Sequence, residues 1–413
     1  MTADVSEMGE TDVTAEQIVA RAEAMRPLLL EDQAATEKRT FFSDEMHERF
    51  REAGFYRILA PRRFGGLELD VATFYRVMMA ISRGCPSTGW ELCLSSGHGL
   101  QLGSYFSAEA QEELFGPHGE FIASMSFAAP TARAIPVDGG YMLQGTWHYA
   151  SGIPHADYHC GLAPVARDSD DPRQRETRLF IIPASKFHRL DDWGDLIGLK
   201  GSGSHSVAVE ETFIPEHHTT PFGFFLDLSS GTTVGYELHG NPMYAGQFMG
   251  FALGEINSVQ AGNAQAMLDE YEQIIGVRTT MAVGDEAPRR YEDRDFQRCY
   301  GLAASWIDAT HSIMVQTGNL YSRYGAEAVA GGRIFDEERT MRLYGQHMTV
   351  QKLAWEAGDL LFRTSSSSGA KDGARMQRYW RDLCAFRSNG YHQHDFRAHT
   401  ITQARFGLPV EFV

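Results

Sequence analysis

The sequence contains few cysteines and no spacing that pairs them. Five cysteines are scattered over 413 residues, without a C-x-x-C pair. This pattern indicates neither a disulfide framework nor a zinc site, so we expect no bound metal. A reducing cytoplasm is the simplest expectation for the location of such a chain.

Long apolar runs and an excess of positive charge are also missing. No segment approaches the ~18 apolar residues of a membrane span. The first ten residues are acidic and lack an apolar core, so we expect no signal peptide. Asp and Glu outnumber Lys and Arg by 54 to 37, a formal net charge of −17. Because nucleic acids and anionic membranes are bound by basic faces, this balance argues against both as partners.

Hydrophobic residues make up 43% of the sequence, which is enough for a substantial core in one large domain or in two to three smaller ones. The periodicity predicts three parts in an α+β fold. These are an N-terminal helical domain (1–120), a middle antiparallel β-domain (121–235) and a C-terminal helical bundle (236–413) that mediates oligomerisation.

Local patterns support this division. Thr14 and Gln17 fit a capping box, and Ser43 and Ser107 can cap further helices. The apolar stretch 71–93 reads as one buried helix. From Phe121 onward, short β-leaning segments alternate with turn residues. Four long helical patterns follow and would pack as an antiparallel bundle: 244–275, 294–324, 336–364 and 374–386.

The segment Gly145–Tyr158 carries aromatic residues, a hydroxyl and a glycine at the end of one predicted strand. The preceding Asp138-Gly139-Gly140 favours a tight hairpin turn. Aromatic faces beside a hydroxyl can hold a flat heteroaromatic ring and contact its edge. The residues alone do not identify that ring.

The same segment resembles the flavin-contacting strand of the acyl-CoA dehydrogenase superfamily. It resembles more closely the two-component flavin monooxygenases that share this fold. Their pattern is roughly G-x-W-x-aromatic-x-S-G, which Gly145–Gly152 matches. The resemblance implies that Ser151 lies near the flavin N5 edge and that Tyr149 lies against the ring.

Further matches surround this strand. Trp90 and His98 match a tryptophan and histidine, eight residues apart, that line the flavin and substrate pocket of the monooxygenase branch. Ser126 matches a serine at the flavin pyrimidine edge. The segment 196–207 resembles the family pattern L-G-x-x-G-T-G-S-x-x-V and contains Ser204, with Trp193 just upstream. The resemblance implies that this segment borders the flavin.

Two weaker matches lie in the C-terminal part. Arg278 matches an arginine that meets the flavin phosphates across a subunit interface, and its guanidinium group suits phosphate oxygens. Gly369 matches a position where backbone approaches a neighbouring subunit's cofactor. The resemblance therefore implies a homotetramer.

The segment 378–394 resembles the family motif W-R-D-(x6)-H. Most acyl-CoA dehydrogenases place a catalytic glutamate eight residues after this aspartate, where this chain has Gly390. A second dehydrogenase base position falls near Ala252, with Glu255 one turn away. Without a carboxylate there is no base for the α-proton of an acyl thioester, which argues against simple dehydrogenation.

The phenol hydroxylases of the family carry a histidine seven residues after the same aspartate. This chain has Asn389 there, which cannot accept a proton at neutral pH. His392 or His394 could reach the same place after a local shift. Otherwise deprotonation of a phenol falls to His98, or the substrate does not need it.

The resemblance implies the oxygenase component of a two-component flavin-dependent monooxygenase. Reduced FMN or FAD would come from a separate NAD(P)H-dependent reductase and react with O2 to a C4a-(hydro)peroxide that hydroxylates a small aromatic or natural-product substrate. Ser151 would protect that adduct, His98 would orient the substrate, and Asn389 or His392 would hydrogen-bond to it. The alternatives are N- or S-oxygenation, an acyl-CoA dehydrogenase-like flavoenzyme with a relocated base, and a non-catalytic flavin-binding homologue.

Overall fold

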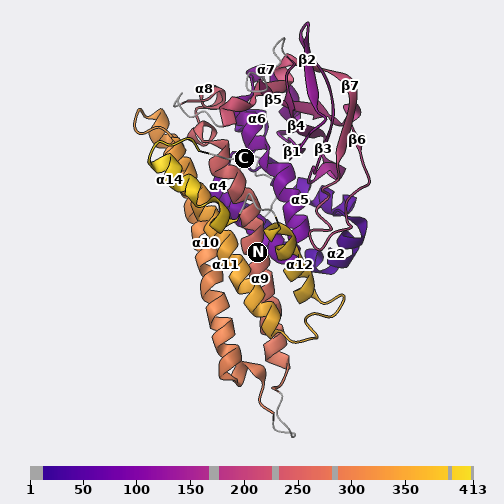
Figure 1. The fold of residues 1–413 in the computed structure, drawn as a ribbon, viewed down its shortest axis with the longest axis vertical. Coiled ribbons are helices and arrows are strands. Elements are labelled where there is room, and N and C mark those ends of the chain that lie inside the picture. Colours follow the sequence, from indigo (N-terminus) through magenta and orange to yellow (C-terminus); the bar gives the residue numbers. More distant parts are fainter. Residues whose placement is uncertain (1–12, 167–175, 226–231, 281–286, 389–392, 411–413) are drawn as a thin grey trace, which may run out of the picture.

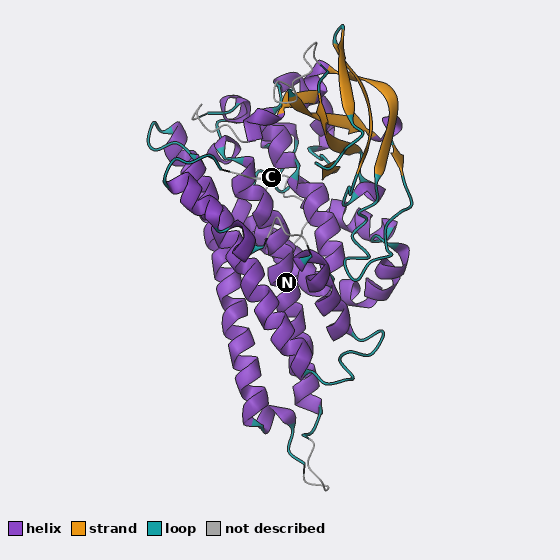
Figure 2. Ribbon diagram, viewed as in Figure 1, coloured by secondary structure: helices purple, strands orange, loops and turns teal. Residues whose placement is uncertain are grey.

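The computed structural model describes residues 13–166, 176–225, 232–280, 287–388 and 393–410. Helices occupy both ends of the chain and strands its middle, so the predicted α+β class is confirmed (Figures 1 and 2). Within the described ranges, the strands all lie between residues 123 and 221, inside the predicted middle segment.

The first part is helical, and its predicted caps are confirmed. Thr14 and Gln17 form a capping box, and the hydroxyls of Ser43 and Ser107 each accept a hydrogen bond from a backbone N–H of the helix that follows. The helices are α1 (Ala15–Ala24), α2 (Arg26–Arg39), α3 (Asp44–Ala53), α4 (Val71–Gly84), α5 (Pro86–Gly97), α6 (Gly99–Tyr105) and α7 (Ala108–Phe115).

The prediction of one helix over 71–93 is wrong. Helix α4 ends before Cys85, whose backbone is extended, and α5 begins at Pro86. Proline lacks an N–H to continue the helix, and its ring disfavours the α conformation of the preceding residue. The break turns α5 into a separate helix that carries Trp90 toward the sheets.

The strands form two four-stranded sheets with a shared apolar core that includes Trp147 and Phe180. One sheet has the order β1-β4-β5-β8 and the other β2-β3-β7-β6. The strands are β1 (Ala123–Ser126), β2 (Arg133–Val137), β3 (Gly140–Trp147), β4 (Tyr158–Pro164), β5 (Thr177–Pro183), β6 (His188–Arg189), β7 (Val207–Pro215) and β8 (Thr219–Pro221).

The expectation of a wholly antiparallel domain is wrong for one pair. β1 and β4 are parallel, with Ala123 opposite Tyr158. Parallel neighbours need a long crossover, and the chain between them supplies one by forming β2 and β3 of the other sheet. The end of β3 is thereby brought beside β1.

The last part is the predicted bundle. It consists of α9 (Phe248–Val277), α10 (Arg294–Val329), α11 (Glu337–Thr364) and α12 (Arg375–Arg387). The first half of α9 is buried on nearly every side because it packs against α4 and α5 as well as the other bundle helices. From beside the sheets, α9 runs to the opposite end of the molecule (Figure 1).

Shorter helices complete the chain. They are α8 (Val234–His239), α13 (His394–Arg397) and α14 (His399–Arg405), with 3-10 turns that include η4 (Ile153–His155) and η7 (Glu216–His218). Across the described ranges, no helix combines the length and the apolar character needed to cross a membrane.

Candidate active site

Three serine hydroxyls and one indole form a buried hydrogen-bonded chain after β3. Trp90 Nε1 donates to Ser151 Oγ at 2.9 Å, and Ser151 Oγ lies 2.7 Å from Ser204 Oγ. Ser204 Oγ in turn lies 2.7 Å from Ser202 Oγ. An indole N–H only donates, whereas a hydroxyl has one hydrogen and two lone pairs. Ser151 therefore keeps either a hydrogen or a lone pair available for a ligand.

The backbone holds Ser151 in place from both sides. Ala150 N donates to His205 O and Gly152 N donates to Ser202 O. Gly152 has φ 80°, and a Cβ there would lie 3.1 Å from Ser95. The end of β3 is thus joined to the segment 202–205, which explains why the two glycine-containing motifs of the sequence meet in space.

An exposed Tyr149 and a half-buried Trp193 form a pair of aromatic rings on the segments that carry the serines. Tyr149 is 55% exposed, and its ring centre lies 5.1 Å from that of Trp193. Trp193 Nε1 donates to Leu199 O at 3.0 Å, which fixes the indole. A large aromatic face left open beside buried hydroxyls is suited to stacking a planar ring. These residues therefore fit the isoalloxazine of a flavin.

Ser126 and His98 are tied to the same strand, β1. Ser126 is buried and donates its hydrogen to His148 O at 3.1 Å, beside Tyr149. His98 is the C-cap residue of α5, and its Nδ1 lies 2.6 Å from Ala123 O. The structure thus brings His98, at the end of α5, and Ser126 to the same strand, β1.

The hydrogen bond of His98 also settles its tautomer. A carbonyl oxygen only accepts, so Nδ1 carries the hydrogen and Nε2 is an acceptor. Burial lowers the pKa of His98 to about 4, although the hydrogen bond to Ala123 opposes this shift. His98 is therefore neutral at physiological pH. It can orient a hydroxyl, but burial makes it a weak base for deprotonating a phenol.

Two carboxylate contacts that the sequence analysis missed support this region. Glu91, beside Trp90, is fully buried and accepts a hydrogen bond from Phe42 N at 2.9 Å. His155 bridges Glu91 and Asp44 at 3.3 and 3.1 Å. Burial, opposed by the contact with His155, raises the pKa of Glu91. A carboxylate inside an otherwise uncharged helix was the available signal, because such residues are rarely buried without a partner.

The second contact orients His148, just before Tyr149. Asp192 accepts hydrogen bonds from Ser206 N at 2.8 Å and Ser206 Oγ at 2.6 Å, and His148 Nδ1 lies 2.8 Å from the same hydroxyl. Burial raises the pKa of Asp192, but the hydrogen bonds from Ser206 outweigh it and the pKa is lowered overall. The hydrogen bonds from Asp192 through Ser206 to His148 thus hold the end of β3 just before Tyr149.

Asp382 of the W-R-D motif holds the loop that precedes the serines. It is buried, and it accepts hydrogen bonds from Leu199 N at 2.6 Å and Ser87 Oγ at 3.4 Å. Burial raises its pKa to about 7, against the effect of the Leu199 hydrogen bond. A Cβ on Gly198 would lie 2.0 Å from Arg381 O. The motif therefore fastens α12 to the loop that carries Trp193 and Ser204.

Glu255 does not have the environment of a ready base. Its side chain is buried, Oε1 has no hydrogen-bond partner, and burial raises its pKa well above the usual value. A Cβ on Gly97 would lie 1.7 Å from Oε1, so the carboxyl group is pressed against α5. A protonated carboxyl in this position is a poor acceptor for the α-proton of a thioester.

Other predicted residues lie elsewhere. Arg278 is exposed at the far end of α9, and Gly369 lies between α11 and α12 at that same end, where Arg290 Nη1 donates to Ser365 O. Asn389, Gly390 and His392 fall outside the described residues.

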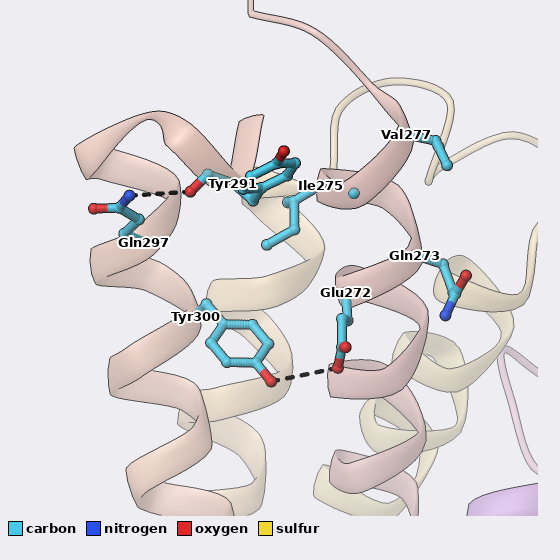
Figure 3. A pocket seen from close by; sticks show the side chains of 8 residues that line it. Glu272, Gln273, Ile275, Val277, Tyr291, Gln297 and Tyr300 are labelled. Carbon is cyan, nitrogen blue, oxygen red and sulfur yellow. Dashed lines mark hydrogen bonds between the residues drawn. The ribbon is translucent and has the colours of Figure 1, made fainter. Parts of the chain in front are cut away.

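A surface hollow of about 610 Å³ lies directly beside Arg278, at the tip of α9 and α10. In it Tyr300 donates to Glu272, and Gln297 donates to the backbone of Tyr291 (Figure 3). Val277, which also lines the hollow, is 66% exposed. The hollow thus presents aromatic and polar side chains, with the carboxylate of Glu272 among them.

Comparisons with known proteins match nearly the whole chain. Residues 15–118 match the acyl-CoA dehydrogenase N-terminal domain and residues 256–394 the C-terminal domain. The oxygenase subunit HsaA of a flavin-dependent monooxygenase from Rhodococcus jostii is 30% identical over 94% of this chain and 98% of its own. The oxygenase component of an FADH2-dependent resorcinol hydroxylase from Rhizobium sp. is 29% identical over 81% of this chain and 80% of its own. The crystal structure of HsaA from Mycobacterium tuberculosis superposes with a TM-score of 0.85 at 27% identity, covering 97% and 100% of the two chains.

Proposed function

The chain belongs to the oxygenase components of flavin-dependent monooxygenases built on the acyl-CoA dehydrogenase fold, and from this premise we propose that it hydroxylates a small aromatic substrate. The observation that carries the proposal is the buried Trp90–Ser151–Ser204 chain beside the open Tyr149–Trp193 pair. Relatives named as hydroxylases of resorcinol and p-hydroxyphenylacetate support an aromatic substrate.

Reduced FMN or FAD, when bound, supplies the electrons that activate O2 for transfer of one oxygen atom. Tyr149 and Trp193 hold the flat ring, and Ser151 and Ser204 hydrogen-bond to its edge. Ser126 and Trp90 complete the wall. Because Trp90 already satisfies one lone pair of Ser151, the serine hydroxyl is held in one direction and is presented to the ligand without a search for rotamers.

Two residues act on the substrate side. His98 Nε2 accepts a hydrogen bond from the substrate hydroxyl and orients it, while the neutral imidazole leaves the proton on the substrate. Asn389 or His392, in the segment outside the described residues, hydrogen-bonds to the substrate. The large buried rings around Trp90, which include Phe386 at 5.5 Å, exclude water and so limit loss of the oxidant as hydrogen peroxide.

The partners in this proposal are a separate NAD(P)H-dependent flavin reductase, from which reduced flavin diffuses, and three further copies of the chain. The exposed guanidinium group of Arg278 supports a subunit contact in which Arg278 and the Gly369 backbone meet a neighbour's flavin. All five cysteines are free, which supports residence in a reducing cytoplasm.

The flavin site can be tested by binding. Tyr149→Ala removes the open ring and should weaken reduced-flavin affinity by about 10-fold, which corresponds to the loss of about 1.4 kcal/mol from one aromatic contact. Phe406→Ala removes a ring that is even more open, 75% exposed, at the C-cap of the last helix described and should leave affinity unchanged. Anaerobic titration monitored by tryptophan fluorescence measures both. Equal affinities in the two variants would contradict the placement of the flavin.

A further inference from the structure

A second group of potential ligand atoms lies where the helical part meets the sheets, on the outer side of β5 and β8. Glu113 comes from α7, and His217 and His218 come from η7, between β7 and β8. One ligand atom from each of the three residues lies within 4.8 Å of the others. Glu113 and His217 are 104 positions apart in the sequence, so no local motif indicates the group.

The two imidazoles converge on one carboxylate. His217 Nε2 lies 2.8 Å from Glu113 Oε2, and His218 Nε2 lies 3.1 Å from Glu113 Oε1. The two rings are nearly perpendicular, with their centres 4.6 Å apart. Glu109, one turn earlier on α7, adds an exposed carboxylate whose Oε1 lies 3.8 Å from His217 Nδ1.

His218 is the second, independent observation. Its side chain is 4% exposed, its Nδ1 makes no hydrogen bond to the described residues, and its Nε2 meets only the Glu113 carboxylate, at 3.1 Å. Buried polar groups normally have partners, and each exception needs an explanation. A cation held between Glu113 and the two histidines would supply the missing partner.

We propose that Glu113, His217 and His218 form a binding site for a divalent transition-metal ion of the Zn²⁺ type. Two imidazoles and one carboxylate are a common zinc ligand set, and nitrogen donors disfavour Mg²⁺ and Ca²⁺, which prefer oxygen. In a tetrahedral site with ligands about 2.0–2.1 Å from the metal, donors lie about 3.4 Å apart. The observed spacing needs only small rotations of the side chains.

The surroundings permit entry and a fourth ligand. A hollow of about 420 Å³ adjoins the site and is lined by Glu109, Arg178, His217 and Thr219 among others. Glu109 or water fills the remaining position. Two carboxylates face the site, and the positive charge of Lys186, which also acts on His218, opposes the ion only in part. The bound metal ties α7 to the β7–β8 connection and so joins the helical part to the sheets.

Zinc binding to the full-length, tag-free protein after removal of metals with EDTA tests the proposal. Isothermal titration should give one Zn²⁺ per chain, and Co²⁺ should give the visible absorption of a low-coordinate site. Glu113→Gln and His218→Ala should each weaken binding by at least about 10-fold, a loss at the lower end of that seen when even supporting residues of metal sites are removed. Glu112→Gln, the exposed neighbour on α7, should bind as the wild type does.

Heat denaturation provides a second readout. Zn²⁺ should raise the Tm of the wild type and of Glu112→Gln, but not of Glu113→Gln. If His218→Ala fails to fold, His217→Ala, at a more exposed position, replaces it. Absence of stoichiometric binding in the wild type, or binding that survives both Glu113→Gln and His217→Ala, would overturn the proposal.

Discussion

Replacing Ser151 by alanine removes the central hydroxyl of the buried chain. Trp90 Nε1 then loses its acceptor at 2.9 Å and Ser204 loses its partner at 2.7 Å. One hydrogen bond contributes about 0.5–1.5 kcal/mol, and an unsatisfied buried donor costs about 1–3 kcal/mol. If Ser151 retains the oxidant by one such bond, the ratio of hydrogen peroxide to hydroxylated product should rise about 3- to 10-fold.

The assay supplies reduced flavin enzymatically under air and measures peroxide and product per flavin oxidised. Ser202→Ala is the matched control, because the Ser202 hydroxyl is linked to the Ser151 hydroxyl only through Ser204. It should keep the wild-type ratio while losing a similar amount of stability. An unchanged peroxide ratio in Ser151→Ala, or an equal rise in Ser202→Ala, would refute the role given to Ser151.

Three further predictions concern the supports of the site. Burial raises the pKa of Asp382 to about 7 in the folded state, above the unfolded value near 3.9, so the free energy of unfolding should fall by up to about 4 kcal/mol as pH rises from 4 to 7. Urea unfolding of Asp382→Asn should not show this fall, and an unchanged dependence on pH would contradict the burial argument. Gly97→Ala should lower the free energy of unfolding by about 1–3 kcal/mol in the same assay, because its Cβ would overlap Glu255 Oε1. The added methyl should cost less in a Glu255→Ala background, and an equal cost in both backgrounds would argue against this contact. Gly198→Ala should weaken flavin binding, because its Cβ would push the loop that carries Trp193 and Ser204 away from Arg381, whereas Gly301→Ala, whose Cβ meets open space on α10, should bind flavin normally. Normal binding in both variants would mean that α12 does not position this loop.

Local patterns were sufficient for most of the helices. Thr14, Ser43 and Ser107 cap helices as predicted, since capping depends on residues three apart. The predicted start of the last bundle helix, at 374, is within one residue of α12. The helix break at Pro86 was overlooked because the apolar pattern continues across it, although proline itself carried the information.

Contacts between distant residues could not be read in this way. Asp382 meets Leu199 across 183 positions, and Glu91 meets Phe42 across 49. Neither leaves a periodic trace in the sequence. The resemblance located Trp90, Ser151 and Ser204 individually, but only the fold shows that one hydrogen-bonded chain joins them. The parallel β1–β4 pair likewise depends on a crossover that strand propensity does not encode.

The central claim is that this chain uses reduced flavin and O2 to place one oxygen atom on an aromatic substrate. The most direct measurement is mass spectrometry of the product formed under ¹⁸O2 with reduced flavin supplied by a separate reductase. The account predicts one ¹⁸O atom in the product and none when the label is in water. Product labelled from water, or bleaching of oxidised flavin by an acyl-CoA without any reductase, would contradict it.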